Sequence, residues 1–140
     1  MILQVFKKLS VIDGRTRNYG TDQPLFDAEV HIVQAVKEHE GIHVTALADM
    51  LNVTKGAVSQ TLMKLQKKGM VVKEPDSQNQ SRLCLKLTPK GEVAYTNHEA
   101  LHRNFDDALK SILQDETEDH KQFLIKFLTE LDSELEKFEE

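Results

Sequence analysis

The stretch TALADMLNVTKGAVSQTLMKLQKKG, from Thr45 to Gly69, decides the fold of this chain. It predicts two short helices joined by a tight turn. Thr45 is the predicted N-cap of the first helix, because its hydroxyl can accept a free backbone N–H. Asn52 is expected to end that helix, since asparagine tolerates the left-handed conformation. Thr54 then caps the second helix, and Gly69 closes it.

The second helix has one apolar face and one polar, basic face. Val58, Leu62 and Leu65 recur at the spacing of a single buried stripe. The lysines of this helix have no acidic residue near them in the sequence, whereas a helix built for solubility mixes both charge signs. Such a face suits the major groove of DNA, where small or amide side chains reach base edges and lysines contact phosphates. The predicted DNA contacts from the two helices are Thr45, Thr54, Lys55, Gly56, Ser59, Gln60, Lys64 and Lys67.

The overall charge hides a local basic region. A chain of 140 residues with 39% hydrophobic and 29% charged residues is expected to form one soluble globular domain. Its net charge is −5, but residues 45–91 hold eight Lys or Arg against three Asp or Glu, so that this segment is +5 and the remainder −10. Phosphate responds to local potential, which salt screens within roughly 10 Å. The acidic total is therefore compatible with DNA binding.

Neither a membrane span nor a signal-peptide core is present in the sequence, and we expect a cytoplasmic protein. The single cysteine, Cys84, rules out an intramolecular disulfide. It lies in the apolar run Leu83 to Leu87, which favours a packed strand cysteine over the alternative of a redox sensor.

The segments around the two helices predict a winged helix-turn-helix. Residues 2–12 form a short helix, residues 13–24 a loop, and Leu25 to His39 a helix with Phe26, Val30, Val33 and Val36 toward the core. Strands are expected at 70–74 and 81–87, with a polar turn between them. A helix pair followed by a β-hairpin is the winged form of the motif. The predicted fold class is mainly α with a small β-hairpin wing.

Two further helices are expected after the wing. Thr88 and Pro89 open a long helix that reaches Leu113, because proline is well placed at the first helical position. A final helix covers about residues 118–138. Its apolar residues alternate spacings of four and three, which is a heptad-type seam, and they are Leu124, Leu128, Leu131, Leu135 and Phe138. We expect this seam to pack on a second copy of the chain.

The element order and three motifs resemble the MarR family of winged-helix transcriptional regulators. The motifs are Val44-Thr45-x-Leu47-Ala48, residues 54–60 (TKGAVSQ) and residues 87–91 (LTPKG). The resemblance is closest over residues 25–91 and implies a DNA-binding lobe there, with dimerisation helices in residues 1–24 and 92–140. It also implies a homodimer on pseudo-palindromic double-stranded DNA, with each second helix in a major groove and each wing along a minor groove.

The wing departs from the family pattern. Many members carry an acid-x-Arg sequence in the wing, but the aligned positions here are Asn79 and Ser81. Arg82 follows one residue later, and its side chain would face the other side of an ideal strand. The wing residues predicted to contact DNA are Gln80, Ser81 and Arg82.

The histidines of the long helix have alternative interpretations. His98-Glu99-Ala100-Leu101-His102 matches the HExxH signature of zinc peptidases, with Glu99 as general base, and a metallopeptidase is the alternative function. His98 and His102 also match, together with His31, the histidine positions of zinc-responsive MarR members, with Asp13 or Glu99 as the carboxylate. Ordinary polar surface histidines are the third interpretation. His39, His43 and His120 have no ligand spacing and are interpreted as ordinary polar residues.

The sequence therefore predicts a homodimeric, DNA-binding transcriptional regulator that is not an enzyme. A regulatory metal such as zinc or a small aromatic molecule is the expected effector, and no cofactor is required. A winged helix used only for protein contacts is disfavoured by the local charge of +5.

Overall fold

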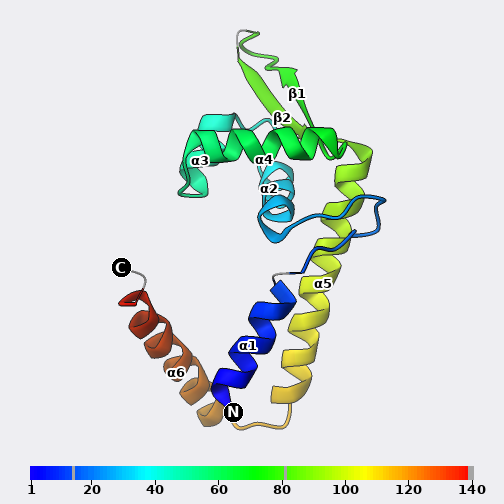
Figure 1. Cartoon of the computed structure of the whole chain (residues 1–140). Helices are drawn as coiled ribbons and strands as arrows, with labels where there is room; N and C mark the ends of the chain where they lie inside the picture. Colours follow the sequence, from blue (N-terminus) through cyan, green and yellow to red (C-terminus); the bar gives the residue numbers. More distant parts are fainter. Residues whose placement is uncertain (14, 81, 139–140) are drawn as a thin grey trace. The chain divides into compact units, whose positions relative to one another are not determined.

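The computed structural model describes residues 1–13, 15–80 and 82–138, although the side chains of Ile2 and Asp13 are not included. The elements appear in the predicted order (Figure 1). They are α1 (Ile2–Asp13), α2 (Asp27–Glu38), α3 (Val44–Met50), α4 (Lys55–Lys67), β1 (Val71–Pro75), β2 (Leu83–Leu87), α5 (Pro89–Leu113) and α6 (Glu118–Glu136).

The hydrophobic core joins α2, α3, α4 and the hairpin. The predicted stripe of α4 is confirmed, because Val58, Leu62 and Leu65 are at most 1% exposed. Burying each of these side chains contributes about 1.5–3 kcal/mol. The other elements supply apolar side chains to the same cluster, namely Leu25, Val30, Val33, Val36, Leu47, Met70, Val71, Leu85 and Ala94. The core therefore fixes the two motif helices and the base of the wing together.

Local turn chemistry sets the boundaries of the motif helices. The Thr54 hydroxyl accepts the backbone N–H of Ala57 at 3.2 Å, which confirms it as the N-cap of α4. Asn52 has φ +52° and Gly69 has φ +74°, so both predicted helix stops adopt the left-handed conformation. The prediction for Thr45 was wrong. The N-cap of α3 is His43, which places Thr45 inside the helix.

The hairpin is antiparallel and gains a short third partner. Its register runs from Val71 opposite Leu87 to Pro75 opposite Leu83. His43 forms an isolated bridge with Cys84, and the N–H of Leu85 donates to the Ile42 carbonyl at 2.9 Å. Cys84 is 6% exposed, so the prediction of a packed strand cysteine is confirmed.

The first turn of α2 differs from expectation. Phe26 was predicted to face the core, but it is 58% exposed because it is the N-cap residue of α2 rather than part of its buried face. Leu25 is fully buried in its place, and Glu29 is also buried. The predicted helix began two residues too early, at Leu25 instead of Asp27.

Contacts divide the chain into two compact units, residues 1–100 and 101–140, and α5 runs across the division. The expectation of a single domain stays a prediction. In the second unit, none of the described residues of α6 is buried. Leu124 and Leu131 are half-buried, whereas Leu128, Leu135 and Phe138 are 49%, 50% and 81% exposed. The seam of α6 is thus an apolar face still open to solvent.

None of the helices in the described part of the chain combines the length and hydrophobicity that a membrane crossing requires.

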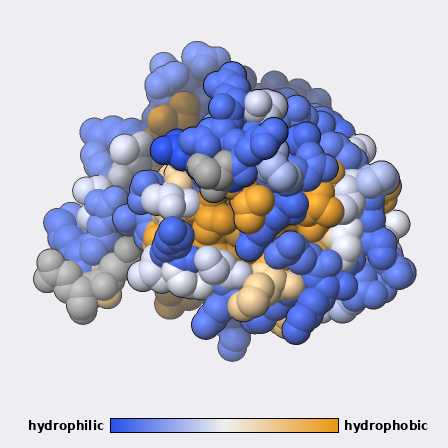
Figure 2. Space-filling model, turned by 90° about the horizontal axis from the view of Figure 1, so that it is seen from above, coloured by the Kyte–Doolittle hydropathy of each residue, from blue (hydrophilic) through white to orange (hydrophobic). Residues whose placement is uncertain are grey.

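Viewed from above, the surface is largely hydrophilic, with an apolar area toward its middle (Figure 2).

Candidate nucleic-acid interface and metal site

The outer face of α4 is exposed along its whole length. Gln60, Lys64 and Lys67 are all exposed on the side opposite the buried stripe, and Met63 is 52% exposed. Among the described residues, no acidic side chain pairs with Lys55, Lys64 or Lys67. The face therefore offers an amide and two free ammonium groups, which can meet base edges and phosphates.

Lys68 does not belong to this basic face. Its Nζ lies 2.6 Å from Glu29 Oε2 and donates to the Pro24 carbonyl at 2.7 Å. The sequence offers Lys68 no acidic partner between Thr54 and Gly69, and its partner, Glu29, comes from α2. A pair between distant positions cannot be seen in the local sequence.

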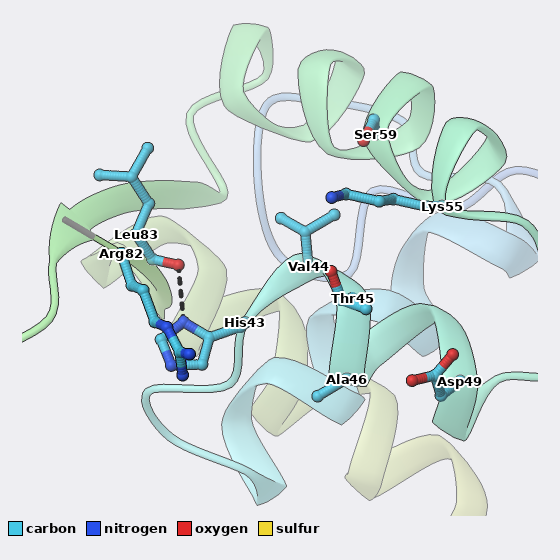
Figure 3. A pocket seen from close by; sticks show the side chains of 9 residues that line it. All are labelled: His43, Val44, Thr45, Ala46, Asp49, Lys55, Ser59, Arg82 and Leu83. Carbon is cyan, nitrogen blue, oxygen red and sulfur yellow. Dashed lines mark hydrogen bonds between the residues drawn. The ribbon is translucent and has the colours of Figure 1, made fainter. Parts of the chain in front are cut away.

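A hollow of about 670 Å³ separates α3 and the start of α4 from the wing. Figure 3 shows Lys55 and Ser59 on α4, Thr45 on α3, and Arg82 at the start of the wing strand around it. The polar lining is completed by His43 and Asp49. These six polar side chains therefore line one concave surface on which basic side chains outnumber acidic ones. Four of the six were predicted to contact DNA.

The wing turn is organised by Asp76. Its Oδ1 accepts the N–H of Gln78 at 2.8 Å, and its own N–H donates to the Arg82 carbonyl at 2.9 Å. The pKa of the Asp76 carboxyl is held below its usual value mainly by the hydrogen bond from the N–H of Gln78. The charges of His43 and Arg82 and the N–H of Asn79 also lower this pKa, whereas partial burial raises it. Asp76 is therefore a stable carboxylate.

The three predicted DNA contacts of the wing lie in different places. Arg82 precedes β2, which begins at Leu83, so the alternation of an ideal strand does not govern its side chain. Its side chain lines the hollow, as does that of His43 (Figure 3). Gln80 is exposed on the turn, and Ser81 lies outside the described residues.

Three of the predicted metal ligands come together. One ligand atom of each of His31, His98 and His102 lies within 4.8 Å of the others. His98 is 2% exposed, and its ring lies 5.5 Å from that of His31 and 5.6 Å from that of Tyr19. His102 follows one turn later on the same helix, α5. Tetrahedral zinc with bonds of about 2.0–2.1 Å to nitrogen would need these atoms about 3.3 Å apart, so small side-chain movements suffice.

The structure does not identify which carboxylate would join the three histidines as a metal ligand. The side chain of Asp13 lies outside the described residues, and Glu99 is not part of the histidine cluster. Sequence reasoning missed Asp27, whose Oδ2 lies 3.4 Å from His31 Nδ1. Their spacing of four residues on one helix was the available signal. A carboxylate on one ring nitrogen directs the other nitrogen toward a metal.

These features define a winged helix-turn-helix lobe, in which α3 and α4 form the motif and the hairpin forms the wing. Residues 25–82 match the model of the MarR family. In this segment the chain is therefore similar to members of that family.

One named relative is similar over most of this chain. The uncharacterized HTH-type transcriptional regulator YhjH of Bacillus subtilis is 27% identical over 113 residues, which cover 81% of this chain and 65% of that protein. The chain therefore spans slightly less than two thirds of that relative.

Two crystal structures share the fold. FabT of Streptococcus pneumoniae in complex with DNA has a TM-score of 0.75 at 22% identity, covering 99% of this chain and 94% of that one. The zinc-responsive MarR family member ZitR of Lactococcus lactis also has a TM-score of 0.75, at 18% identity, covering 96% of this chain and 94% of that one.

Proposed function

We propose that this chain is a DNA-binding transcriptional regulator whose α4 enters the major groove. The observation that carries this proposal is the exposed face of α4, where Gln60, Lys64 and Lys67 project without an acidic partner among the described residues. The basic hollow beside it extends the same surface to the wing through Lys55 and Arg82. The fold shared with FabT, solved in complex with DNA, supports this use.

The groups on α4 have different roles in this proposal. Ser59, Gln60 and the small Gly56 lie in the N-terminal half of the helix, where side chains can approach base edges. Lys64 and Lys67 lie nearer its end and would neutralise phosphates, which gives affinity without sequence information. Thr45, at the start of α3, and Arg82, in the wing, would contact the DNA backbone on the two sides of α4.

Salt dependence and two kinds of substitution test the proposal. Binding of a random duplex, followed by fluorescence anisotropy, should weaken steeply and linearly in a log–log plot against salt, because counterions are released. Lys64→Ala and Lys67→Ala should weaken all sequences alike, each reducing the slope by about 1. Gln60→Ala should instead change the preference among sequences, by about 1–3 kcal/mol at a contacted base pair.

Lys110→Ala is a matched control, because Lys110 is an exposed helical lysine in the second unit. It should bind as the unmodified chain does. A flat response to salt in the unmodified chain would contradict the proposal.

The proposed regulator acts as a homodimer. Leu128 and Leu135 of α6 and Phe138, just after its end, are 49% to 81% exposed, and they need a partner surface because exposed apolar area of this kind is unfavourable in water. A two-fold axis supplies the same seam from a second copy and places two recognition helices about 34 Å apart on DNA. Sedimentation velocity should give twice the chain mass, and a monomer at micromolar concentration would contradict this.

Zinc is the effector that we propose for this regulator. His31, His98 and His102 would hold it, with Asp27 orienting His31. Bound zinc would supply a tetrahedral cation that ties α2 to α5. The similarity to a zinc-responsive family member supports this choice. The small aromatic effector stays an alternative that no particular residue favours.

Zinc titration tests the effector. Zinc should bind the unmodified chain in calorimetry and change its affinity for a duplex selected from a random pool. His102→Ala should weaken zinc binding by at least about 10-fold to 100-fold, the range for residues that only support a ligand, and remove the effect of zinc on DNA. Because His102 is exposed, its loss should leave the core intact. His120→Ala, at an exposed histidine paired with Glu116, is the control. If His102→Ala responds to zinc as the unmodified chain does, the site is elsewhere.

The metallopeptidase alternative gains no support from the position of its motif. A catalytic zinc site needs a coordination position that substrate can reach. His98 is nearly inaccessible, and its ring lies against those of His31 and Tyr19. We therefore propose a regulator without enzymatic activity, which acts in the cytoplasm.

A further inference from the structure

Met63 is a large apolar side chain on the outer face of α4. It is 52% exposed, and among the described residues of α4 no other large apolar side chain is exposed. Its neighbours on this face are polar, because Ser59 and Gln60 lie one turn before it and Lys67 lies one turn after it. Single exposed apolar side chains are common on protein surfaces, so exposure alone indicates no function. Met63 differs from them because it lies on the face proposed to enter the major groove.

Packing within the chain does not account for a methionine at this position. The stripe that α4 contributes to the core consists of Val58, Leu62 and Leu65, and Met63 lies outside it. Helix formation does not need this methionine either, because glutamine, lysine and glutamate have similar helix propensities and are soluble on an exposed face. The side chain of Met63 is therefore available for a contact outside the chain.

The major groove offers one apolar group to such a side chain. The base edges there present hydrogen-bond donors and acceptors, whereas the C5 methyl group of thymine is apolar. A thioether that covered a donor or acceptor would remove its water without replacing the hydrogen bond, which is unfavourable. Contact with the methyl group instead removes apolar surface of both partners from water. Because methionine is unbranched and flexible, its end can adjust to the position of the methyl group.

The helical spacing places this contact close to that of Gln60. Met63 is three residues further along α4, which is about 4.5 Å along the helix axis. Successive bases of a DNA strand are about 3.4 Å apart along the duplex axis. A helix that lies along the groove therefore brings Met63 to within one or two base pairs of the pair that Gln60 contacts.

We propose that Met63 is a specificity-determining residue, which contacts the C5 methyl group of a thymine in the major groove, one or two base pairs from the pair that Gln60 contacts. The proposal rests on the proposed DNA-binding function and names a base that α4 reads. It adds an apolar contact to the amide and the lysines of the same face.

The experiment removes the methyl group from the DNA and the thioether from the protein. The probe is a duplex that the unmodified chain selects from a random pool, and each thymine of one half is replaced in turn by deoxyuridine. This replacement removes only the C5 methyl group and keeps the hydrogen-bonding groups. At one position the unmodified chain should bind about fourfold more weakly in anisotropy, the effect of one buried methyl group. Met63→Ala should bind the thymine and deoxyuridine duplexes of that position alike.

Two further variants serve as controls. Met50→Ala is matched to the test, because Met50 is 43% exposed at the end of α3 and its loss leaves the outer face of α4 unchanged. This variant should retain the fourfold difference. Met63→Leu keeps an apolar side chain at the position and should retain a difference of about twofold or more. Alanine and leucine both favour the helical conformation, so both variants at position 63 are expected to fold.

The outcomes separate this inference from the function on which it rests. If the unmodified chain shows no salt-dependent DNA binding, the proposed function is wrong and the reading of thymine falls with it. If the chain binds DNA but no deoxyuridine weakens binding, or Met63→Ala keeps the difference, only the role of Met63 is overturned. Loss of the difference in Met50→Ala or in Met63→Leu would also overturn it, because the effect would then not depend on an apolar side chain at position 63.

Discussion

Replacing Lys68 with methionine is expected to lower the free energy of unfolding by about 3 kcal/mol, because it leaves the Glu29 carboxylate buried without its cation. Glu29 is 3% exposed. Its Oε2 accepts the N–H of Phe26 at 2.9 Å and the ammonium of Lys68 at 2.6 Å, whereas Oε1 has no hydrogen-bond partner among the described residues. The backbone N–H alone cannot compensate a buried charge.

Urea denaturation followed by circular dichroism measures this effect. The neighbouring Lys67 provides the matched control, because it is exposed and unpaired with any acid among the described residues, and Lys67→Met should change stability by less than about 0.5 kcal/mol. The double variant Glu29→Gln and Lys68→Met should recover part of the loss, since it removes the buried charge. Equal losses for Lys67→Met and Lys68→Met would show that the pair does not stabilise the fold.

Gly91→Ala is expected to destabilise the protein by about 1–3 kcal/mol or more through a steric clash. A Cβ atom at position 91 would lie 2.1 Å from the Met70 carbonyl oxygen and 3.1 Å from its carbon. That carbonyl also accepts the N–H of Thr88 at 3.0 Å, so it cannot withdraw without breaking the junction between the wing and α5. The start of α5 must therefore move away from the strand.

Gly56→Ala separates this clash from the general effect of adding a methyl group to a helix. Gly56 is also in the first turn of a helix, but the nearest atom to its added Cβ is the Thr54 hydroxyl oxygen at 3.9 Å. Alanine there should stabilise the chain by up to about 1 kcal/mol, because it favours the helical conformation. Thermal unfolding compares the two variants, and a similar melting temperature for both would contradict the clash.

The elements of the lobe could be predicted because their signals are local. The cap of α4, the left-handed Asn52 and Gly69, and the buried stripe of Val58, Leu62 and Leu65 depend on residues within two turns of one another. The convergence of His31 with His98 and His102 was predicted only through the resemblance to a family. Residue spacing alone predicts only the pair His98 and His102 on α5, because spacing does not show which other helix packs against α5.

Contacts between distant residues could not be predicted in this way. Lys68 has the same local sequence environment as Lys67, and only the packing of α2 against α4 gives it Glu29 as a partner. The contact of His43 with Asp76 could not be predicted for the same reason, because Asp76 is 33 residues away along the chain. The sequence by itself determined the order of helices, the wing and the exposed, basic side of α4, since these follow from periodicity and caps. Only the tertiary structure decided which charges are paired and which have no partner among the described residues, because pairing depends on distance in space.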